Sequence, residues 1–220
     1  MKTTLSPMFA ALALACAALP AQAQVVGDAK AAEGKIAMCI GCHGIKGYQA
    51  SFPQVYKVPM IAGQNARYIA IALEGYRKGD RKHPSMRAVA GSLTDQDIAD
   101  LAAFYEQQGK TEGQAELPAP RDAGAQVTQL LQKGACVSCH GDNFSKPIDP
   151  SYPKISGQHD DYLFSSLRAY KNDAHQTWGR ANPVMAGMAK QFSEAELKAM
   201  ARYIGSLPGE LKTVPEPRFR

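Results

Sequence analysis

The sequence predicts an all-α protein made of two tandem domains that share one plan. Two observations carry this prediction. The pattern C-x-x-C-H occurs twice, at residues 39–43 and 136–140, and the motifs that follow it recur in the same order. Apolar residues with helical spacing favour helices, and no stretch shows the alternation typical of a strand. Each domain is therefore expected to consist of a few helices joined by loops.

The repeat runs through most of the chain. In each half, C-x-x-C-H is followed by P-x-I-x-G-Q, at residues 59–64 and 153–158, and then by R-x-x-P-x-M, at residues 81–86 and 180–185. The second half is longer before its methionine and carries there the only tryptophan, Trp178. Internal similarity of this kind predicts duplicated structural units.

Periodicity and capping signals predict three helices in each half. They cover residues 29–38, residues 65–78, the segment after Thr94, residues 124–133, residues 160–172 and the segment after Ser193. Asp28 is expected to cap the first helix. Thr94 and Ser193 each precede an acidic residue at the third following position, which is a capping-box pattern.

The export signal and the linker complete the division of the chain. We predict a signal peptide at 1–23, a first domain at 24–113, a linker at 114–123, a second domain at 124–208 and a tail at 209–220. Lys2, an apolar run and Ala-Gln-Ala at 21–23 favour cleavage before Gln24 and export to the periplasm. Cys16 would be removed with the signal. No later stretch approaches ~20 uninterrupted apolar residues, so at most peripheral membrane association is expected.

The repeated pentapeptide is the attachment signature of a c-type haem. Two thiols three positions apart can each form a thioether with a porphyrin vinyl group, and the adjacent histidine can bind the iron. We therefore predict two covalently bound haem c groups, held by Cys39, Cys42, Cys136 and Cys139 with His43 and His140 as iron ligands. A disulfide would leave both histidines unexplained. A zinc ribbon would separate its cysteine pairs by ~15–20 residues, far fewer than here.

The repeat also indicates the second axial ligands. Met86 and Met185 are the only methionines that coincide across the two halves, and both follow R-x-x-P in a predicted loop. A thioether sulfur is a known axial partner that raises the reduction potential of a haem. The other methionines, Met38, Met60, Met188 and Met200, are expected to pack in loops or cores. The remaining candidates, His83, His159 and His175, each occur in one copy only and are expected to be solvated.

These motifs, with an [LF]-[ST]-x-x-[DE] helix closing each half, resemble those of the di-haem cytochrome c4 family over essentially the whole mature chain. The resemblance implies two class I cytochrome c domains, each with a few helices wrapped around a covalently bound haem. It also implies that Pro59 and Pro153 accept the Nδ1–H of the haem histidines. Arg81 and Arg180 would approach a haem propionate, or form surface salt bridges as the alternative.

An electron carrier, not an enzyme, is the favoured function. Both irons are expected to have two axial ligands, and no acid–base or nucleophile constellation is visible elsewhere. The resemblance implies redox partners: a membrane quinol-oxidising complex or dehydrogenase as donor, and a terminal oxidase or other acceptor. The alternatives are a small di-haem oxidoreductase of the peroxidase or thiosulfate-oxidising kind, and a cytochrome subunit of a larger dehydrogenase. The formal net charge is +5 without a basic run, so nucleic-acid binding is not expected.

Overall fold

The computed structural model describes residues 25–108, 110 and 117–215. The predicted signal peptide and its cleavage site lie outside the described residues, as do 114–116 of the predicted linker and 216–220 of the predicted tail. None of the helices in the described part of the chain is long and apolar enough to cross a membrane.

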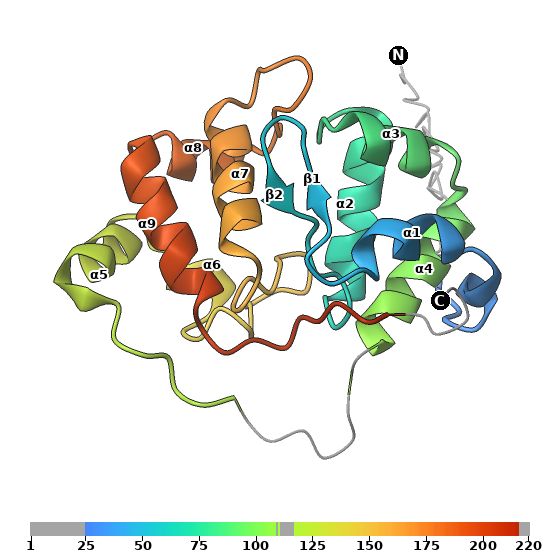
Figure 1. Cartoon of the computed structure of the whole chain (residues 1–220), viewed down its shortest axis with the longest axis horizontal. Coiled ribbons are helices and arrows are strands. Elements are labelled where there is room, and N and C mark those ends of the chain that lie inside the picture. The colour runs from blue at the N-terminus through green and yellow to red at the C-terminus, as the bar shows by residue number, and fades with distance from the viewer. Residues whose placement is uncertain (1–24, 109, 111–116, 216–220) are drawn as a thin grey trace, which may run out of the picture.

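Helices form two halves that lie side by side (Figure 1). The first half contains η1 (Ala31–Gly34), α1 (Ala37–His43), α2 (Ala66–Lys78), α3 (Pro84–Gly91) and α4 (Asp95–Gln107). The second half contains α5 (Gly124–Lys133), α6 (Val137–His140), α7 (Asp160–Lys171), α8 (Pro183–Ala189) and α9 (Glu194–Gly205). The all-α prediction is confirmed.

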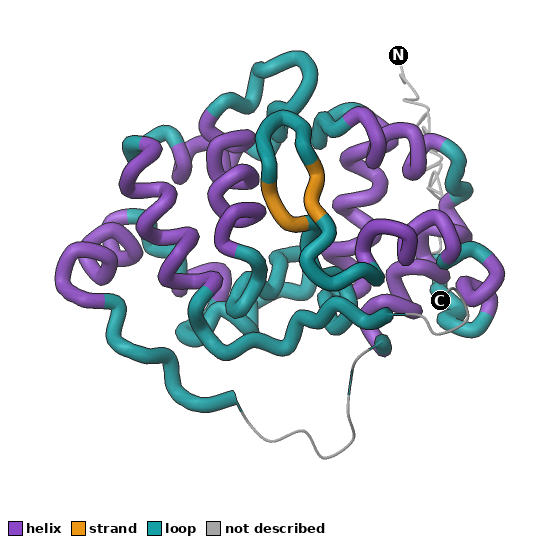
Figure 2. The backbone as a smooth tube through the Cα atoms, viewed as in Figure 1, coloured by secondary structure: helices purple, strands orange, loops and turns teal. Residues whose placement is uncertain are grey.

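One short hairpin lies between the halves (Figure 2). Strands β1 (Gln49–Ala50) and β2 (Tyr56–Lys57) pair antiparallel, with Gln49 opposite Lys57 and Ala50 opposite Tyr56. Two residues are too few to show an alternating pattern in a sequence, so this pairing was not predictable from periodicity. The hairpin brings Lys57 to the second half, where its Nζ lies 3.5 Å from the Asp161 carboxylate.

Most helix predictions agree with the structure, but the first one is wrong in its extent. The predicted helix at 29–38 is replaced by η1 and by α1, which covers the C-x-x-C-H motif itself. The break follows Gly34, which is a poor helix former. Ile36 and Ile40, one helical turn apart, are then both buried. Asp28 does not cap a helix; its side chain accepts a hydrogen bond from the Lys30 N–H at 2.9 Å.

Each half has its own apolar core around its last helix. In the first half Ile98 and Leu101 of α4 are buried against α2, and in the second half Leu197 and Met200 of α9 are buried against α7. Both helices begin with the predicted capping box, at Thr94 and at Ser193. The buried position of Met200 agrees with its predicted packing role.

The segment after α9 crosses to the first half (Figure 1). The Lys212 N–H donates to the Ala62 carbonyl oxygen at 3.0 Å, and Leu211 is buried. Glu210 pairs with Lys154 of the second half. The segment after α9 is therefore hydrogen-bonded to the loop that precedes α2.

Candidate haem sites

The two C-x-x-C-H motifs lie on short helices. Cys39, Cys42 and His43 are on α1, whereas Cys136 is the N-cap of α6. Cys39 packs against the first core, Cys136 packs against the second, and Cys42 is exposed. The four described cysteines form no disulfide. Burial raises the pKa of the Cys39 and Cys136 thiols, so both are neutral at physiological pH.

Each haem-motif histidine has a carbonyl partner. His43 Nδ1 lies 2.8 Å from the Pro59 carbonyl oxygen, and His140 Nδ1 lies 3.1 Å from the Pro153 carbonyl oxygen. Since a carbonyl oxygen only accepts, Nδ1 carries the proton and Nε2 keeps its lone pair. Burial lowers the pKa of both imidazoles, and the neutral form is the one that binds metals.

The prediction that Met86 and Met185 lie in loops is wrong. Both residues lie in the first turn of short helices, α3 and α8. A proline occupies the start of each helix, where its missing N–H costs nothing. His83 accepts a hydrogen bond from the Met86 N–H at 3.4 Å, and Asn182 accepts one from the Met185 N–H at 2.9 Å. Both methionine side chains are half-buried.

His83 is therefore a helix cap, not the solvated side chain that was predicted. Because its Nδ1 accepts a backbone N–H, its neutral ring carries the proton on Nε2. That nitrogen has no lone pair to offer to iron in this tautomer. The other two histidines considered as axial ligands do not cap the methionine helices. His159 precedes α7, and His175 is exposed and stacks against Trp178 at 4.3 Å between ring centroids.

Arg81 and Arg180 lie at the contact between the halves, where they face each other in an antiparallel backbone bridge. Arg81 donates to the hydroxyls of Tyr68 at 2.9 Å and Tyr162 at 3.2 Å, and Arg180 donates to Tyr162 at 3.4 Å. No ion pair joins either arginine to a carboxylate in the described ranges. The alternative of a surface salt bridge is therefore wrong.

The two guanidinium groups leave positive charge uncompensated inside the protein. Burial alone would raise the pKa of Tyr162, but the neighbouring Arg180 and Arg81 lower it to about 7. Arg81 Nε is a buried donor without a hydrogen-bond partner. A buried charge is normally paired with an opposite charge, and a buried donor is normally bound to an acceptor. The carboxylates of haem propionates have that chemistry, so these residues fit the predicted cofactor.

Sequence reasoning missed the tyrosines of this cluster. Tyr68 and Tyr76 occupy positions in α2 that correspond to Tyr162 and Tyr170 in α7. The Arg81 guanidinium lies 4.8 Å from the Tyr76 ring centroid, and that of Arg180 lies 5.4 Å from Tyr170. The signal was available, because each pair follows its G-Q dipeptide at the same distances.

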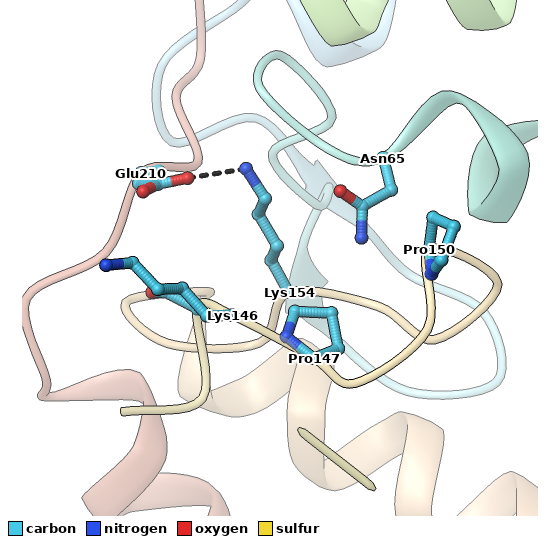
Figure 3. Close-up of a pocket in the computed structure, with 7 residues that line it drawn as sticks. Asn65, Lys146, Pro147, Pro150, Lys154 and Glu210 are labelled. Carbon is cyan, nitrogen blue, oxygen red and sulfur yellow. Dashed lines mark hydrogen bonds and ion pairs between the residues drawn. The ribbon is translucent and has the colours of Figure 1, made fainter. Parts of the chain in front are cut away.

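A separate surface pocket lies where the two halves meet the tail. Asn65, Lys146, Lys154 and Glu210 are among its lining residues, and the Lys154 side chain points towards Glu210 (Figure 3). The ion pair between these two side chains joins the second half to the tail. The lining contains no cysteine, histidine or methionine, so this pocket is not one of the predicted haem sites.

Comparison with known proteins agrees with this reading. The family model described as Cytochrome c matches residues 31–108 and 123–208. Cytochrome c4 of Azotobacter vinelandii is 32% identical over 198 residues, covering 84% of this chain and 91% of the relative. A thiosulfate dehydrogenase electron acceptor of Stutzerimonas stutzeri (strain A1501) is 28% identical, covering 90% and 92%.

Solved structures show the same fold. The reduced recombinant cytochrome c4 from Pseudomonas stutzeri superposes with a TM-score of 0.62 at 28% identity, covering 83% of this chain and all of that one. The duplicated family match, the relatives and the shared fold agree with the two haem motifs. The chain therefore belongs to the cytochrome c family and, within it, to the di-haem cytochromes c4, which are electron-transfer proteins with two covalently bound haem c groups.

Proposed function

We propose that this cytochrome carries electrons through two six-coordinate haems. Cys39 and Cys42 hold one haem, and Cys136 and Cys139 hold the other. The axial pairs are His43 with Met86, and His140 with Met185. When bound, the haem iron supplies reversible one-electron exchange between its ferrous and ferric states.

The observation that carries the proposal is the geometry shared by both halves. In each, desolvation lowers the pKa of the attachment-motif histidine and favours its neutral form, and its Nδ1 is bound to a proline carbonyl. A second contact of this kind fixes the tautomer and ring orientation and raises the basicity of the ligand. Nε2 is then the nitrogen of each ring that remains for the iron.

The methionine assignment is supported by the helix caps. His83 caps the helix of Met86, and Asn182 caps the helix of Met185 in the same way. His83, the alternative axial ligand in the first half, therefore has a capping role that an asparagine fills in the second half. Asparagine is not a haem ligand in the sites known for c-type cytochromes. A thioether ligand favours a relatively high reduction potential, which suits a carrier.

Arg81 and Arg180 are proposed to bind haem propionates. Their lack of carboxylate partners and the orphan Arg81 Nε support this assignment. Propionates bound there would compensate the charge that now lowers the pKa of Tyr162. The arginines would thereby hold both cofactors at the contact between the halves.

The proposed place of work is the periplasm. The export signal read from residues 1–23 supports it. The proposed donors are a quinol-oxidising membrane complex or a dehydrogenase, and the proposed acceptor is a terminal oxidase or a similar protein. The relative named as a thiosulfate dehydrogenase electron acceptor supports a dehydrogenase as donor. Stopped-flow reduction by each purified donor at matched concentrations distinguishes the two.

Axial ligation is tested by Met86→Ala and Met185→Ala in the mature holoprotein. In each variant, the weak long-wavelength sulfur-to-iron band of the ferric protein should fall by about half. The affected haem should also show a lower potential and bind carbon monoxide when reduced. Met38→Ala, which changes an exposed methionine without a counterpart in the repeat, should leave the band unchanged.

His83→Asn gives the first half the cap that the second half already has. If Met86 is the ligand, this variant should keep the full band. If His83 were the ligand instead, the band would come from Met185 alone and would not change, but the first haem would lose its second axial ligand and bind carbon monoxide when reduced. That result would make the assignment of Met86 wrong. Ready binding of carbon monoxide by the wild-type protein at one haem would mean an open iron, and the di-haem oxidoreductase alternative would then be preferred.

A further inference from the structure

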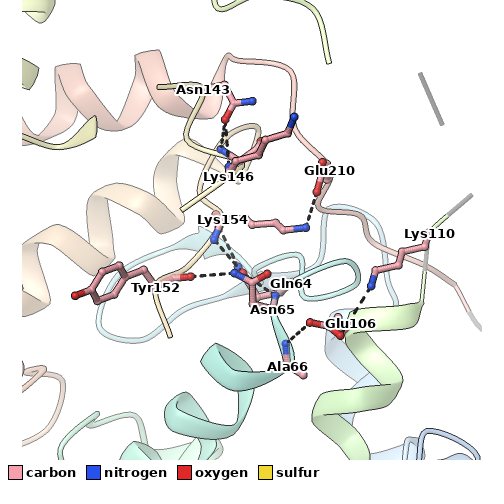
Figure 4. A network of polar contacts seen from close by, with 11 residues as sticks. Gln64, Asn65, Ala66, Glu106, Lys110, Asn143, Lys146, Tyr152, Lys154 and Glu210 are labelled. Atoms are coloured by element: carbon pink, nitrogen blue, oxygen red, sulfur yellow. Dashed lines mark hydrogen bonds and ion pairs between the residues drawn. The ribbon is translucent and has the colours of Figure 1, made fainter. Parts of the chain in front are cut away.

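Two glutamines of the repeated P-x-I-x-G-Q motif cross from one half to the other. Gln64 Oε1 accepts from the Lys154 N–H and Gln64 Nε2 donates to the Lys154 carbonyl oxygen, both at 2.9 Å (Figure 4). Gln158 makes the same pair of bonds to Met60, at 3.1 Å and 2.8 Å. Both glutamine side chains are buried. Through its glutamine, each half therefore forms two hydrogen bonds with the backbone of the other half, at equivalent positions.

The orientation of both amide groups is fixed by a further bond. Gln64 Oε1 also accepts from the Asn65 N–H at 3.0 Å, and Gln158 Oε1 accepts from the His159 N–H at 3.0 Å. Each amide oxygen thus faces two N–H donors, and each amide nitrogen faces a carbonyl. A flipped amide would place like groups against each other at all three contacts.

The N–H groups that donate to the two glutamines belong to the same peptide groups whose carbonyl oxygens accept from the haem-motif histidines. The Met60 N–H and the Pro59 carbonyl belong to one peptide group, and that carbonyl accepts from His43. Likewise the Lys154 N–H shares a peptide group with the Pro153 carbonyl that accepts from His140. A continuous chain of hydrogen bonds therefore runs from each histidine, through one peptide group, to a glutamine of the opposite half.

Hydrogen bonds in such a chain polarise one another. Because Gln158 Oε1 accepts a hydrogen bond from the Met60 N–H, the Pro59 oxygen of the same peptide group becomes a stronger acceptor for the His43 Nδ1–H. A stronger acceptor gives the imidazole more anionic character and makes it a more basic ligand. A more basic ligand stabilises the ferric state over the ferrous state.

We propose that each glutamine tunes the axial histidine of the other half: Gln158 acts on His43, and Gln64 acts on His140. Both are positioning residues that act through a peptide group. The proposal rests on the proposed function, in which these histidines bind the haem irons. It assigns to the contact between halves a role in setting the two reduction potentials, beyond holding the halves together.

The test uses the mature di-haem protein with Gln158→Leu and Gln64→Leu as a matched pair. Gln158→Asn and Gln64→Asn are milder variants that keep an amide but cannot reach across. Two quantities are measured: the ring Nδ1–H resonances of His43 and His140 in the reduced protein by histidine-selective ¹⁵N NMR, and the two midpoint potentials by spectroelectrochemistry. The haem signals of each half are assigned from their contacts with neighbouring side chains.

The proposal predicts a crossed pattern. Gln158→Leu should shift the His43 ring N–H towards the position of a weaker hydrogen bond and raise the potential of the haem of the first half. His140 should change much less. Gln64→Leu should do the reverse. We expect a several-fold change in the ferric-to-ferrous ratio at a fixed potential, where tenfold corresponds to about 59 mV for one electron.

Three results would overturn the proposal: a change at the histidine of the same half, equal changes at both histidines, or no change in folded Leu and Asn variants. The glutamines would then serve only to hold the interface. The wild-type spectrum separates this failure from that of the proposed function. If the ring carbon protons of His43 and His140 lack the large ring-current shifts of haem ligands, the axial assignment itself is wrong, and the tuning proposal is overturned with it.

Discussion

The two halves share their haem motifs and their crossing glutamines, but each also contacts the other through a segment of its own. The first half extends the hairpin of β1 and β2, from which Lys57 contacts Asp161. The second half extends the loop at residues 172–179, where the Gly179 carbonyl oxygen accepts from the Lys82 N–H at 3.0 Å. The shared motifs therefore supply the same haem-binding groups twice, while these two segments make the surroundings of the two sites different.

The differences extend to the sites themselves. The carbonyl contact of His43 measures 2.8 Å, against 3.1 Å for His140. Tyr162 accepts from both interface arginines, whereas its counterpart Tyr68 accepts from Arg81. The methionine helices are capped by different residue types. Such differences in charge and hydrogen bonding around a haem set its potential, so we expect the two haems to be inequivalent.

The largest expected effect comes from removing one core side chain in each half. Ile98 and Leu197 occupy equivalent positions in α4 and α9 and are 2% and 0% exposed. Ile98→Ala and Leu197→Ala should each lower the free energy of unfolding by about 2–5 kcal/mol, because a buried cavity remains. Native-state amide hydrogen exchange, read separately on the two helices, shows which half becomes less stable.

If the halves are independent in stability, Ile98→Ala should accelerate exchange in α4 and leave α9 nearly unchanged, with the converse for Leu197→Ala. Equal acceleration in both helices would mean that the halves unfold as one unit. The comparison between halves would then apply to their haem chemistry but not to their stability. Ala31→Gly, at an exposed position in η1, is a control that should affect neither helix.

The parts that the sequence predicted are those with a local signal or a duplicate. Helix α5 begins and ends at the predicted residues, and the capping boxes at Thr94 and Ser193 are both formed. The duplicated motifs indicated Met86 and Met185 as a pair, without any knowledge of distances. A capping box needs only four consecutive residues, so it can be recognised without the rest of the chain.

The parts that were missed depend on contacts between distant residues. Two alternatives were open for Arg81 and Arg180, because nothing local shows that Arg81 lies against tyrosines of both halves or that both arginines donate to Tyr162. The tail lacked any pattern, and its bond to Ala62 spans most of the chain. The short helices of Met86 and Met185 were recognisable in principle, since a cap followed by proline is a helix-start signal.

A smaller effect is expected from the segment that crosses between the halves. Leu211 is buried beside Lys212, whose N–H donates to Ala62 of the first half, so Leu211→Ala should weaken this contact by roughly 1–3 kcal/mol of lost apolar burial. The Lys212 amide, which donates to Ala62, should then exchange faster, as should the loop before α2. Thr213→Ala, in the same segment, serves as the control. Unchanged exchange at Lys212 would show that Leu211 does not hold the segment in place.

The smallest expected effect concerns one carboxylate that only the first half contains. Asp100 is buried in α4, and its equivalent in α9 is Ala199. Asp100 Oδ1 accepts from the Asp28 N–H and from Gln96 Nε2, both at 2.8 Å. These hydrogen bonds to the charged form lower the pKa of Asp100. The residue thereby ties the start of the described chain to the core of the first half.

The sign of the pH dependence follows from this shift. A carboxyl group whose pKa is lower in the folded state stabilises that state fully above its unfolded pKa, about 3.9, and loses this contribution as the pH falls through the folded pKa. The stability difference between wild type and Asp100→Asn should therefore be largest at neutral pH and shrink as the pH falls below about 4. Amide exchange of α4 over this range measures the difference, while α9 should respond equally in both proteins. A difference in α4 that stays constant with pH would show that the charge of Asp100 contributes nothing, and that this side chain does not distinguish the two halves in acid.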